Sequence, residues 1–194
     1  MVNKNLKNIQ IVLASGSPRR QQFLKDLGIE FKIRLKDVAE IYPVTLVREE
    51  ITNYLAILKA KSQHDLITDK ELLITSDTIV WLENEALGKP KDFEDARQIL
   101  LKLSGKTHEV ITSVCFFSKK TYSTIFDVTE VTFGVLSNEM IEFYLKEFQP
   151  FDKAGAYGIQ DWLGLVGVTS IKGSYTNVMG LPTEKVFSFL KNIK

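Results

Sequence analysis

Near its beginning the chain reads Leu13-Ala-Ser-Gly-Ser-Pro-Arg-Arg-Gln-Gln-Phe-Leu24, and this stretch joins an expected strand to an expected helix. Residues 9–14 are mostly apolar and end in small residues, which is typical of a buried strand. Ser17 can cap a helix, and Pro18 suits the first helical position, where its missing N–H is not needed. Gly28 is expected to end that helix. Free backbone N–H groups and the helix dipole then face the loop, so the stretch predicts an anion site.

Two arginines lie in the first turn of this expected helix. Positive charge there opposes the helix dipole, so Arg19 and Arg20 indicate a bound anion. Guanidinium groups match phosphate oxygens well. The alternative is an ordinary strand-to-helix turn with two solvated arginines. If only one of the pair binds an anion, we expect Arg20 to have the structural role.

Length and composition favour a globular protein of one domain, or of one domain with two lobes. The 194 residues are 44% hydrophobic and 25% charged, and the net charge is +1. A net charge this close to zero creates no strong electrostatic field that would attract nucleic acid or an acidic membrane surface, and we expect neither as a partner. The sequence contains no apolar run of about 20 residues and does not begin like a signal peptide, which favours the cytoplasm. A single cysteine, Cys115, excludes a disulfide framework, and the apolar strand-like run around it predicts a buried thiol. Two histidines make a structural zinc site a poor interpretation.

The remaining pattern predicts alternating strands and helices. Expected strands cover about 9–14, 31–35, 72–75, 79–82, 86–90, 109–117, 122–133 and 166–172. Expected helices cover about 18–27, 47–62, 93–104, 137–149 and 182–190. Asp92 is expected to cap the third of these helices, and Ser137 to open the fourth. Because hairpins are mixed with helical crossovers, the order predicts an α/β fold with a mixed sheet.

Asp77 is the most unusual acidic residue, because it follows an apolar strand and precedes another. A buried carboxylate must be paired, hydrogen-bonded or bound to metal, and a purely structural role is the alternative. Glu40, Lys59 and Lys89 lie in or near expected loops, where each alone would read as a solvated side chain. Together these residues suit a polyanionic substrate bound with a divalent cation.

Several well-known catalytic patterns are absent from the sequence. It has no Gly-x-x-x-x-Gly-Lys-Ser/Thr loop and no Gly-x-Gly-x-x-Gly. Residues 15–17 lack the flanking glycines of a nucleophile elbow. Residues 155–158 match the Gly-x-x-Gly loop of RNA-binding KH domains only superficially, because a basic surface is missing.

Motifs along the whole chain resemble those of the Maf family of nucleoside triphosphate pyrophosphatases. The first is Leu-Ala-Ser-x-Ser-Pro-Arg-Arg in the opening stretch, and five further matches follow in the family's order. They are Ser76-Asp-Thr78, Leu87-Gly-Lys-Pro90, Leu103-Ser-Gly-Lys-Thr-His108, Asp152-Lys-Ala-Gly-Ala-Tyr-Gly-Ile-Gln160 and Asn177-Val-Met-Gly-Leu-Pro182.

The resemblance implies a fold and an activity. The fold would be inosine-triphosphatase-like, with a mixed, elongated sheet flanked by helices and a central cleft between two lobes. The activity would be hydrolysis of a nucleoside triphosphate to the monophosphate and pyrophosphate, with a divalent metal cation, Mg²⁺ or Mn²⁺. The loop ending in Gln160 is similar to that of the subgroup acting on dTTP and UTP, whereas the subgroup acting on 7-methyl-GTP has a different, Ser-containing loop.

The resemblance also implies roles for particular residues. Asp77 corresponds to the proton acceptor that activates water. Arg19, Thr78 and Gln160 correspond to positions tied to substrate choice. Many family members carry an acidic pair where this chain has Ala39 beside Glu40, so we expect Glu40 and Asp77 to be the metal ligands.

We therefore interpret residues 1–194 as a single Maf-like domain of a cytoplasmic enzyme that hydrolyses dTTP and UTP. Modified pyrimidine nucleotides are further candidate substrates, and a homodimer is compatible with the family. Alternatives are the same fold acting on 7-methyl-GTP and a non-catalytic nucleotide-binding regulator of cell division. The expected substrate-binding residues are Ser15, Ser17, Arg19, Arg20, Lys59, Thr78, Lys89 and Gln160.

Overall fold

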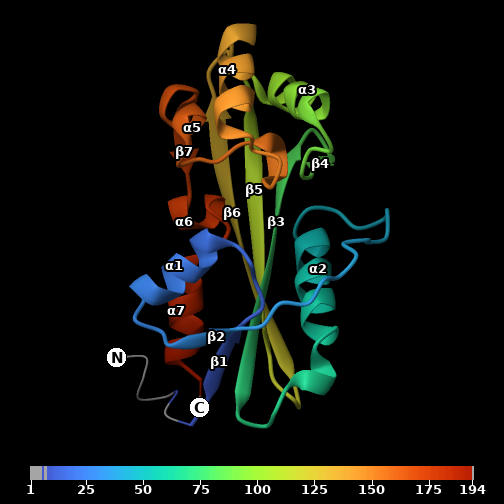
Figure 1. Ribbon diagram of the computed structural model, residues 1–194, viewed down its shortest axis with the longest axis vertical. Coiled ribbons are helices and arrows are strands. Elements are labelled where there is room, and N and C mark those ends of the chain that lie inside the picture. Colours follow the sequence, from blue (N-terminus) through green and yellow to red (C-terminus); the bar gives the residue numbers. More distant parts are fainter. Residues whose placement is uncertain (1–5, 7, 194) are drawn as a thin grey trace. The chain divides into compact units, whose positions relative to one another are not determined.

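A computed structural model describes residue 6 and residues 8–193 (Figure 1). The strands are β1 Gln10–Leu13, β2 Phe31–Ile33, β3 Glu71–Leu82, β4 Glu85–Leu87, β5 Thr107–Phe117, β6 Tyr122–Phe133 and β7 Val168–Lys172. The α-helices are α1 Pro18–Asp26, α2 Glu49–Lys61, α3 Phe93–Leu103, α4 Asn138–Phe148, α5 Trp162–Val166, α6 Tyr175–Val178 and α7 Thr183–Lys191. Two short 3₁₀ helices are η2 His64–Leu66 and η3 Ala154–Ala156.

All of these strands belong to one mixed sheet. Their order is β2-β1-β3-β5-β6-β7, and β4 pairs with β3 off this path. The strand β1 runs parallel to both β2 and β3, whereas β4 is antiparallel to β3 and β7 is antiparallel to β6. The predicted α/β class with a mixed sheet is therefore confirmed.

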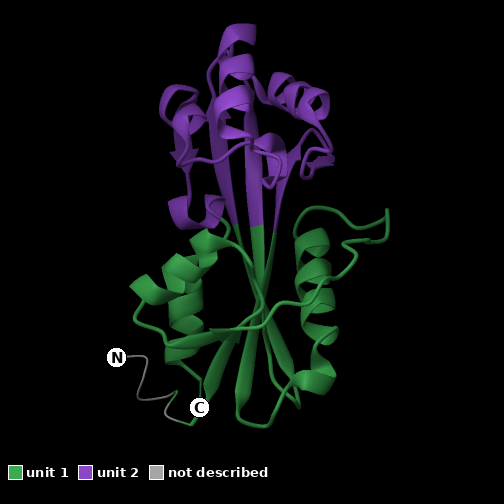
Figure 2. Ribbon diagram, in the orientation of Figure 1, with its two compact units in different colours: residues 1–77, 112–127, 180–194 green, residues 78–111, 128–179 purple. Residues whose placement is uncertain are grey.

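The chain divides into two compact units (Figure 2). Unit 1 comprises residues 1–77, 112–127 and 180–194, and unit 2 comprises residues 78–111 and 128–179. Each of β3, β5 and β6 contributes residues to both units.

In unit 1, apolar clusters cover both faces of its part of the sheet. Side chains alternate between the faces of a strand. Along β3, Leu72 and Ile74 therefore join Leu24 of α1 in a cluster that also includes α7. Leu73, between them, packs on the opposite face with α2 and with Cys115, which is buried as the sequence predicted.

Unit 2 packs α3 and α4 into a single apolar cluster with β3, β5 and β6. Both helices begin at capping residues that the sequence predicted. The Asp92 carboxylate accepts a hydrogen bond from the Asp95 N–H at 2.8 Å, and the Ser137 hydroxyl accepts one from the Met140 N–H at 3.2 Å. Each cap satisfies a backbone donor that would otherwise lack an intrahelical partner.

The structure corrects the prediction in three places. The strand β3 runs without interruption through Asp77, so the predicted break between residues 75 and 79 was wrong. A salt bridge to that carboxylate allows it to lie inside a buried strand. The predicted strand 166–172 begins only at Val168, after α5, and the short helix α6 follows it where no helix was predicted. Both helices have five residues or fewer, too few to show helical periodicity.

None of the helices in the described part of the chain combines the length and hydrophobicity that crossing a bilayer requires.

Candidate active site

The centre of the candidate site is a lysine between two carboxylates in unit 1. The Lys59 Nζ atom of α2 lies 2.5 Å from Asp77 Oδ1 and 2.9 Å from Glu40 Oε1. The side chains are 7% exposed for Asp77, 19% for Lys59 and 44% for Glu40. The sequence placed Asp77 at a strand break, Lys59 near the end of a helix and Glu40 in a loop, and the structure brings both carboxylates to one ammonium group.

Local structure explains why Asp77 faces α2. Thr75 and Asp77 are two residues apart on β3, so their side chains point to the same face of the sheet. The Thr75 hydroxyl donates to the carbonyl of Ala56 at 2.7 Å, which fixes α2 against this face. The hydroxyl of Ser113, on the neighbouring β5, lies 2.6 Å from that of Thr52 in α2, which makes a second buried contact between the sheet and this helix.

The electrostatics of Asp77 suit a group that exchanges a proton. Burial raises the pKa of the Asp77 carboxyl above its ordinary value, and the ammonium of Lys59 opposes part of that rise. Paired with Lys59, the carboxylate can remain charged inside the unit. A carboxyl whose pKa moves toward neutrality is a better proton acceptor at physiological pH than an exposed aspartate.

Arg20 is held by protein groups rather than pointing into solvent. Its Nε donates to the carbonyl of Gly180 at 2.8 Å, and its Nη1 donates to the carbonyl of Ser76 at 3.0 Å and to the Ser15 hydroxyl at 3.4 Å. Burial lowers the pKa of the guanidinium to about 10, and the charge of Asp77 opposes that fall. These contacts favour a structural role for Arg20, beside the strand that carries Asp77.

The loop before α1 has the predicted outline. Pro18 occupies the first position of the helix and Ser17 the capping position. Within the described residues, however, the Ser17 side chain makes no capping hydrogen bond. Its N–H instead donates to the buried Ser15 hydroxyl at 3.2 Å. Arg19 is partly buried in the first turn, where the sequence predicted an anion ligand.

Three predicted residues belong to unit 2 and are described within that unit. Thr78 follows Asp77 directly in β3 and is partly buried. Lys89 is exposed just after β4, and Gln160 is exposed at the end of the loop 152–160. The Gly155 N–H donates to the carbonyl of Gly88 at 3.0 Å, which ties this loop to the segment that carries Lys89.

Sequence reasoning missed two kinds of contributor. The carbonyls of Ser76 and Gly180 hold Arg20, but a carbonyl is present in every residue and leaves no signal of its own. The side chains of Tyr144 and Asp161 bond to each other at 2.9 Å beside Gln160. Tyr144 falls within the expected helix 137–149, and that expectation indicated nothing about a contact with Asp161.

Comparisons with known proteins agree with this architecture. The family model described as Maf-like protein matches residues 10–193. A protein of Flavobacterium psychrophilum named dTTP/UTP pyrophosphatase is 59% identical over 192 residues, covering 99% of this chain and 98% of that protein. A protein of the same name from Flavobacterium johnsoniae is 56% identical and covers 100% of both chains. Among solved structures, the Ham1 protein of Staphylococcus aureus covers 95% of this chain and 100% of its own, with a TM-score of 0.56 and 14% identity. That structure shows a shared fold.

Proposed function

From the premise that this chain belongs to the Maf family, we propose that it hydrolyses dTTP and UTP to the monophosphate and pyrophosphate. The observation that carries the chemistry is the buried Asp77 carboxylate paired with Lys59. The choice of nucleotide is supported by the full-length relatives that bear the name dTTP/UTP pyrophosphatase.

Asp77 accepts a proton from the attacking water in this proposal. Its raised pKa keeps the carboxylate basic enough to take the proton, and Lys59 keeps it ionised before the reaction. Water attack at the α-phosphorus then releases pyrophosphate. Arg19 and the backbone N–H groups at the start of α1 bind phosphate oxygens, where charge develops as the leaving group departs.

A divalent cation, Mg²⁺ or Mn²⁺, fits the donor set of Glu40 and Asp77. Among the described residues no group of three or more histidine, cysteine or acidic side chains could hold a metal. Two carboxylates are nevertheless a sufficient protein contribution, because magnesium sites often take their remaining ligands from water and substrate phosphates. The metal would neutralise charge on the phosphates. In this structure the Lys59 ammonium forms ion pairs with the same two carboxylates, so at least one of these ion pairs would break when a cation binds.

The base is selected by Gln160, with contributions from Arg19 and Thr78. A glutamine amide offers one acceptor and a pair of donor hydrogens, which complement the adjacent N–H and carbonyl on the pairing edge of uracil or thymine. Gln160 is exposed and thus accessible to a base. The other proposed substrate-binding residues are Ser15, Ser17, Arg20 and Lys59 in unit 1 and Lys89 in unit 2.

Three further predictions accompany this function. We propose that residues 1–194 act as a single Maf-like domain, that the enzyme is cytoplasmic and that it forms a homodimer.

The test is a nucleotide panel with Mg²⁺ or Mn²⁺, scored separately for pyrophosphate and orthophosphate. UTP and dTTP should release pyrophosphate, and reaction in ¹⁸O-water should label the monophosphate. Orthophosphate with a nucleoside diphosphate as the first products would contradict the proposed reaction. A preference for 7-methyl-GTP would reassign the substrate, and absence of any turnover would favour a nucleotide-binding regulator.

A further inference from the structure

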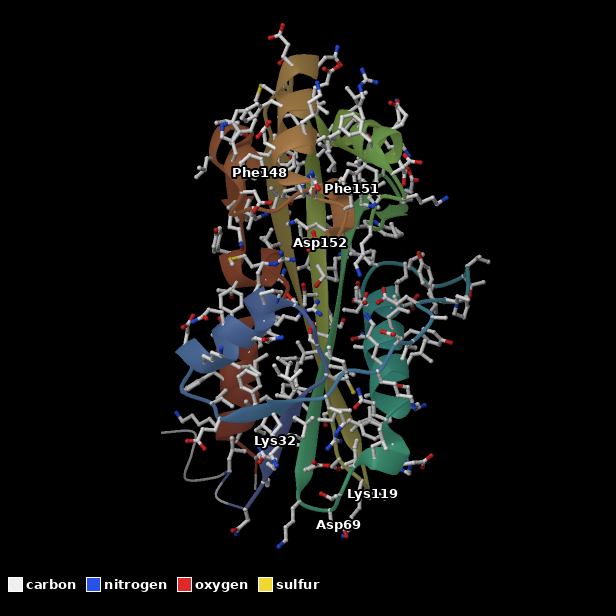
Figure 3. The ribbon with its side chains drawn as sticks, in the orientation of Figure 1. Lys32, Asp69, Lys119, Phe148, Phe151 and Asp152 are labelled. Atoms are coloured by element: carbon white, nitrogen blue, oxygen red, sulfur yellow. The ribbon has the colours of Figure 1, made fainter. Side chains whose placement is uncertain are left out.

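The loop 152–160 is held in unit 2 by a hydrogen-bond network next to Gln160. Figure 3 labels Phe148, the last residue of α4, and Asp152, the first residue of the loop. Within α4, the fully buried Tyr144 donates through its hydroxyl to Asp161 Oδ2 at 2.9 Å. The same hydroxyl accepts from the Gly158 N–H at 3.0 Å. The Asp161 N–H donates to the carbonyl of Gly158 at 3.0 Å, so the chain on either side of Gln160 is closed into a turn.

Close packing reinforces this network. A Cβ atom added to Gly158 would lie 2.4 Å from Asp161 Oδ2, so the carboxylate rests directly on the loop backbone. A Cβ atom added to Gly164 of α5 would lie 1.8 Å from the carbonyl oxygen of Ile159. The backbone around Gln160 is therefore enclosed from two sides, with no room for side chains at these glycines.

The charge of Lys153 and the protonated hydroxyl of Tyr144 both stabilise the Asp161 carboxylate in this turn. Lys153 Nζ lies 3.8 Å from Asp161 Oδ2 and 2.8 Å from Asp152 Oδ1, which balances the partly buried carboxylate. Burial raises the pKa of Tyr144, so its hydroxyl keeps the proton that it donates to Asp161. Within residues 157–161, only Gln160 is exposed, and the neighbouring Ile159 is 6% exposed. The anchored turn thus presents one amide to solvent.

Base selection requires that this amide be held in one orientation. An amide rotated by half a turn exchanges its donor and acceptor and then complements cytosine, which presents an amino group and a bare ring nitrogen. A mobile glutamine would therefore accept either base. A side chain whose backbone is fixed on both sides loses less freedom on binding and discriminates more strongly.

We propose that Tyr144 and Asp161 are positioning residues that fix Gln160 for the selection of uracil and thymine over cytosine. The inference rests on the proposed function and names a source for its specificity. Neither residue touches the reacting atoms in this scheme. Their effect passes through the backbone of the turn to the Gln160 amide.

The central experiment measures kcat/KM for UTP and CTP in Tyr144→Phe, which removes the hydroxyl and keeps the buried ring. The ratio of kcat/KM for UTP to kcat/KM for CTP should fall about 3–10-fold, which is the effect of losing one hydrogen bond between Gln160 and the base. The loss should appear mainly in KM for UTP, because Asp77 and Lys59 are unaltered. Tyr157→Phe is the matched control. It removes another buried hydroxyl of the same loop, 2.8 Å from His108 Nε2, and should lower Tm while leaving the ratio unchanged.

A double-mutant cycle separates positioning from general stability. In a Gln160→Ala background, Tyr144→Phe should cause no further loss of selectivity, because the side chain that it positions is gone. An equal loss with and without Gln160 would overturn the inference. So would a wild-type ratio in Tyr144→Phe, or an equal loss in Tyr157→Phe. If Tyr144→Phe does not fold, Asp161→Ala carries the same test, because it removes the acceptor of the Tyr144 hydroxyl.

Hydrogen exchange gives a readout that does not depend on turnover. The amides of residues 158–161 should exchange faster in Tyr144→Phe than in the wild type, while amides in unit 1 stay unchanged. Unchanged exchange in the turn would contradict the inference. A wild-type protein that releases no pyrophosphate from UTP or dTTP would contradict the proposed function and the inference with it. An active, selective wild type whose ratio survives Tyr144→Phe would contradict the inference alone.

Discussion

The charged cluster in unit 1 and the anchored loop in unit 2 are built by opposite means. Around Lys59 the contacts are ion pairs between side chains from separate segments. Around Gln160 the contacts fix the backbone, through glycines, one tyrosine hydroxyl and the Asp161 carboxylate. The Asp77 side chain in unit 1 is only 7% exposed, whereas Gln160 in unit 2 lies on the surface.

The difference indicates how each region fulfils its proposed role. A buried carboxylate has a shifted pKa, which proton transfer requires, but it depends on a single partner for its charge. A neutral amide selects a base by its orientation and not by charge. Several weak contacts together hold the backbone that carries the Gln160 amide. We therefore expect single substitutions in unit 1 to act strongly on rate, and those in unit 2 to act weakly and on selectivity.

Asp77→Asn should have the largest effect on activity. The substitution keeps the shape and removes the proton acceptor, so kcat for UTP should fall roughly 10²–10⁴-fold. We expect Tm to change little, because Lys59 keeps its contact with Glu40. Pyrophosphate release and thermal unfolding measure the two quantities. Wild-type turnover in this variant would assign Asp77 a structural role and remove the basis of the comparison.

Lys59→Met should rank second, with a loss in kcat of roughly 10²-fold, as for removal of one charge-stabilising donor. The ammonium lowers the pKa of Asp77, so without it the pKa should rise further. The activity should then require a higher pH to reach its plateau. Because Asp77 binds its proton more tightly in the folded state than in the unfolded state, the variant's stability should fall as pH rises through that pKa. An unshifted pH–rate profile would contradict the pairing.

Arg19→Ala and Arg20→Ala test whether the two arginines differ. Loss of a charge-assisted phosphate contact by Arg19 should lower kcat/KM about 10–150-fold at unchanged Tm. Arg20→Ala removes the donor that serves the carbonyls of Ser76 and Gly180, so it should lower Tm as well. Full activity in both variants would rule out the anion site predicted at the start of α1.

Gln160→Ala should have the smallest effect on rate and the clearest effect on selectivity. We expect kcat/KM for UTP and dTTP to fall about 10-fold more than that for CTP, because a site built on base hydrogen bonds loses its discrimination. The exposed side chain should leave Tm unchanged. An equal loss on all three nucleotides would return the source of selectivity to Arg19 and Thr78.

The sequence predicted those parts of the fold that are encoded locally. The caps at Asp92 and Ser137 follow from side-chain chemistry at a helix start, and both are observed. The helices α5 and α6 were missed because they are too short to display a period. Asp77 stood out because a charge in an apolar strand requires an explanation, yet the same argument wrongly predicted a break in β3.

Tertiary pairing could not be predicted in the same way. The contact between Lys59 and Asp77 depends on how α2 lies on β3, which no local pattern specifies. Likewise, Tyr144 and Asp161 are 17 residues apart and meet only after α4 and the following loop have packed. The motif resemblance indicated functional residues such as Asp77 and Gln160, and the structure shows which side chains lie against them or their backbone.

The segmentation of unit 1 has a consequence for synthesis on the ribosome. This unit includes residues 1–77, which are synthesised before any residue of unit 2, and residues 180–194, which are synthesised after all of unit 2. The carbonyl of Gly180 holds Arg20, and Leu190 of α7 completes a core cluster with β1 and β3. A nascent or prematurely terminated chain that stops before residue 180 therefore lacks part of the framework around Asp77. Unit 2 lies wholly within residues 78–179, so every residue of this unit has been synthesised before unit 1 can be completed.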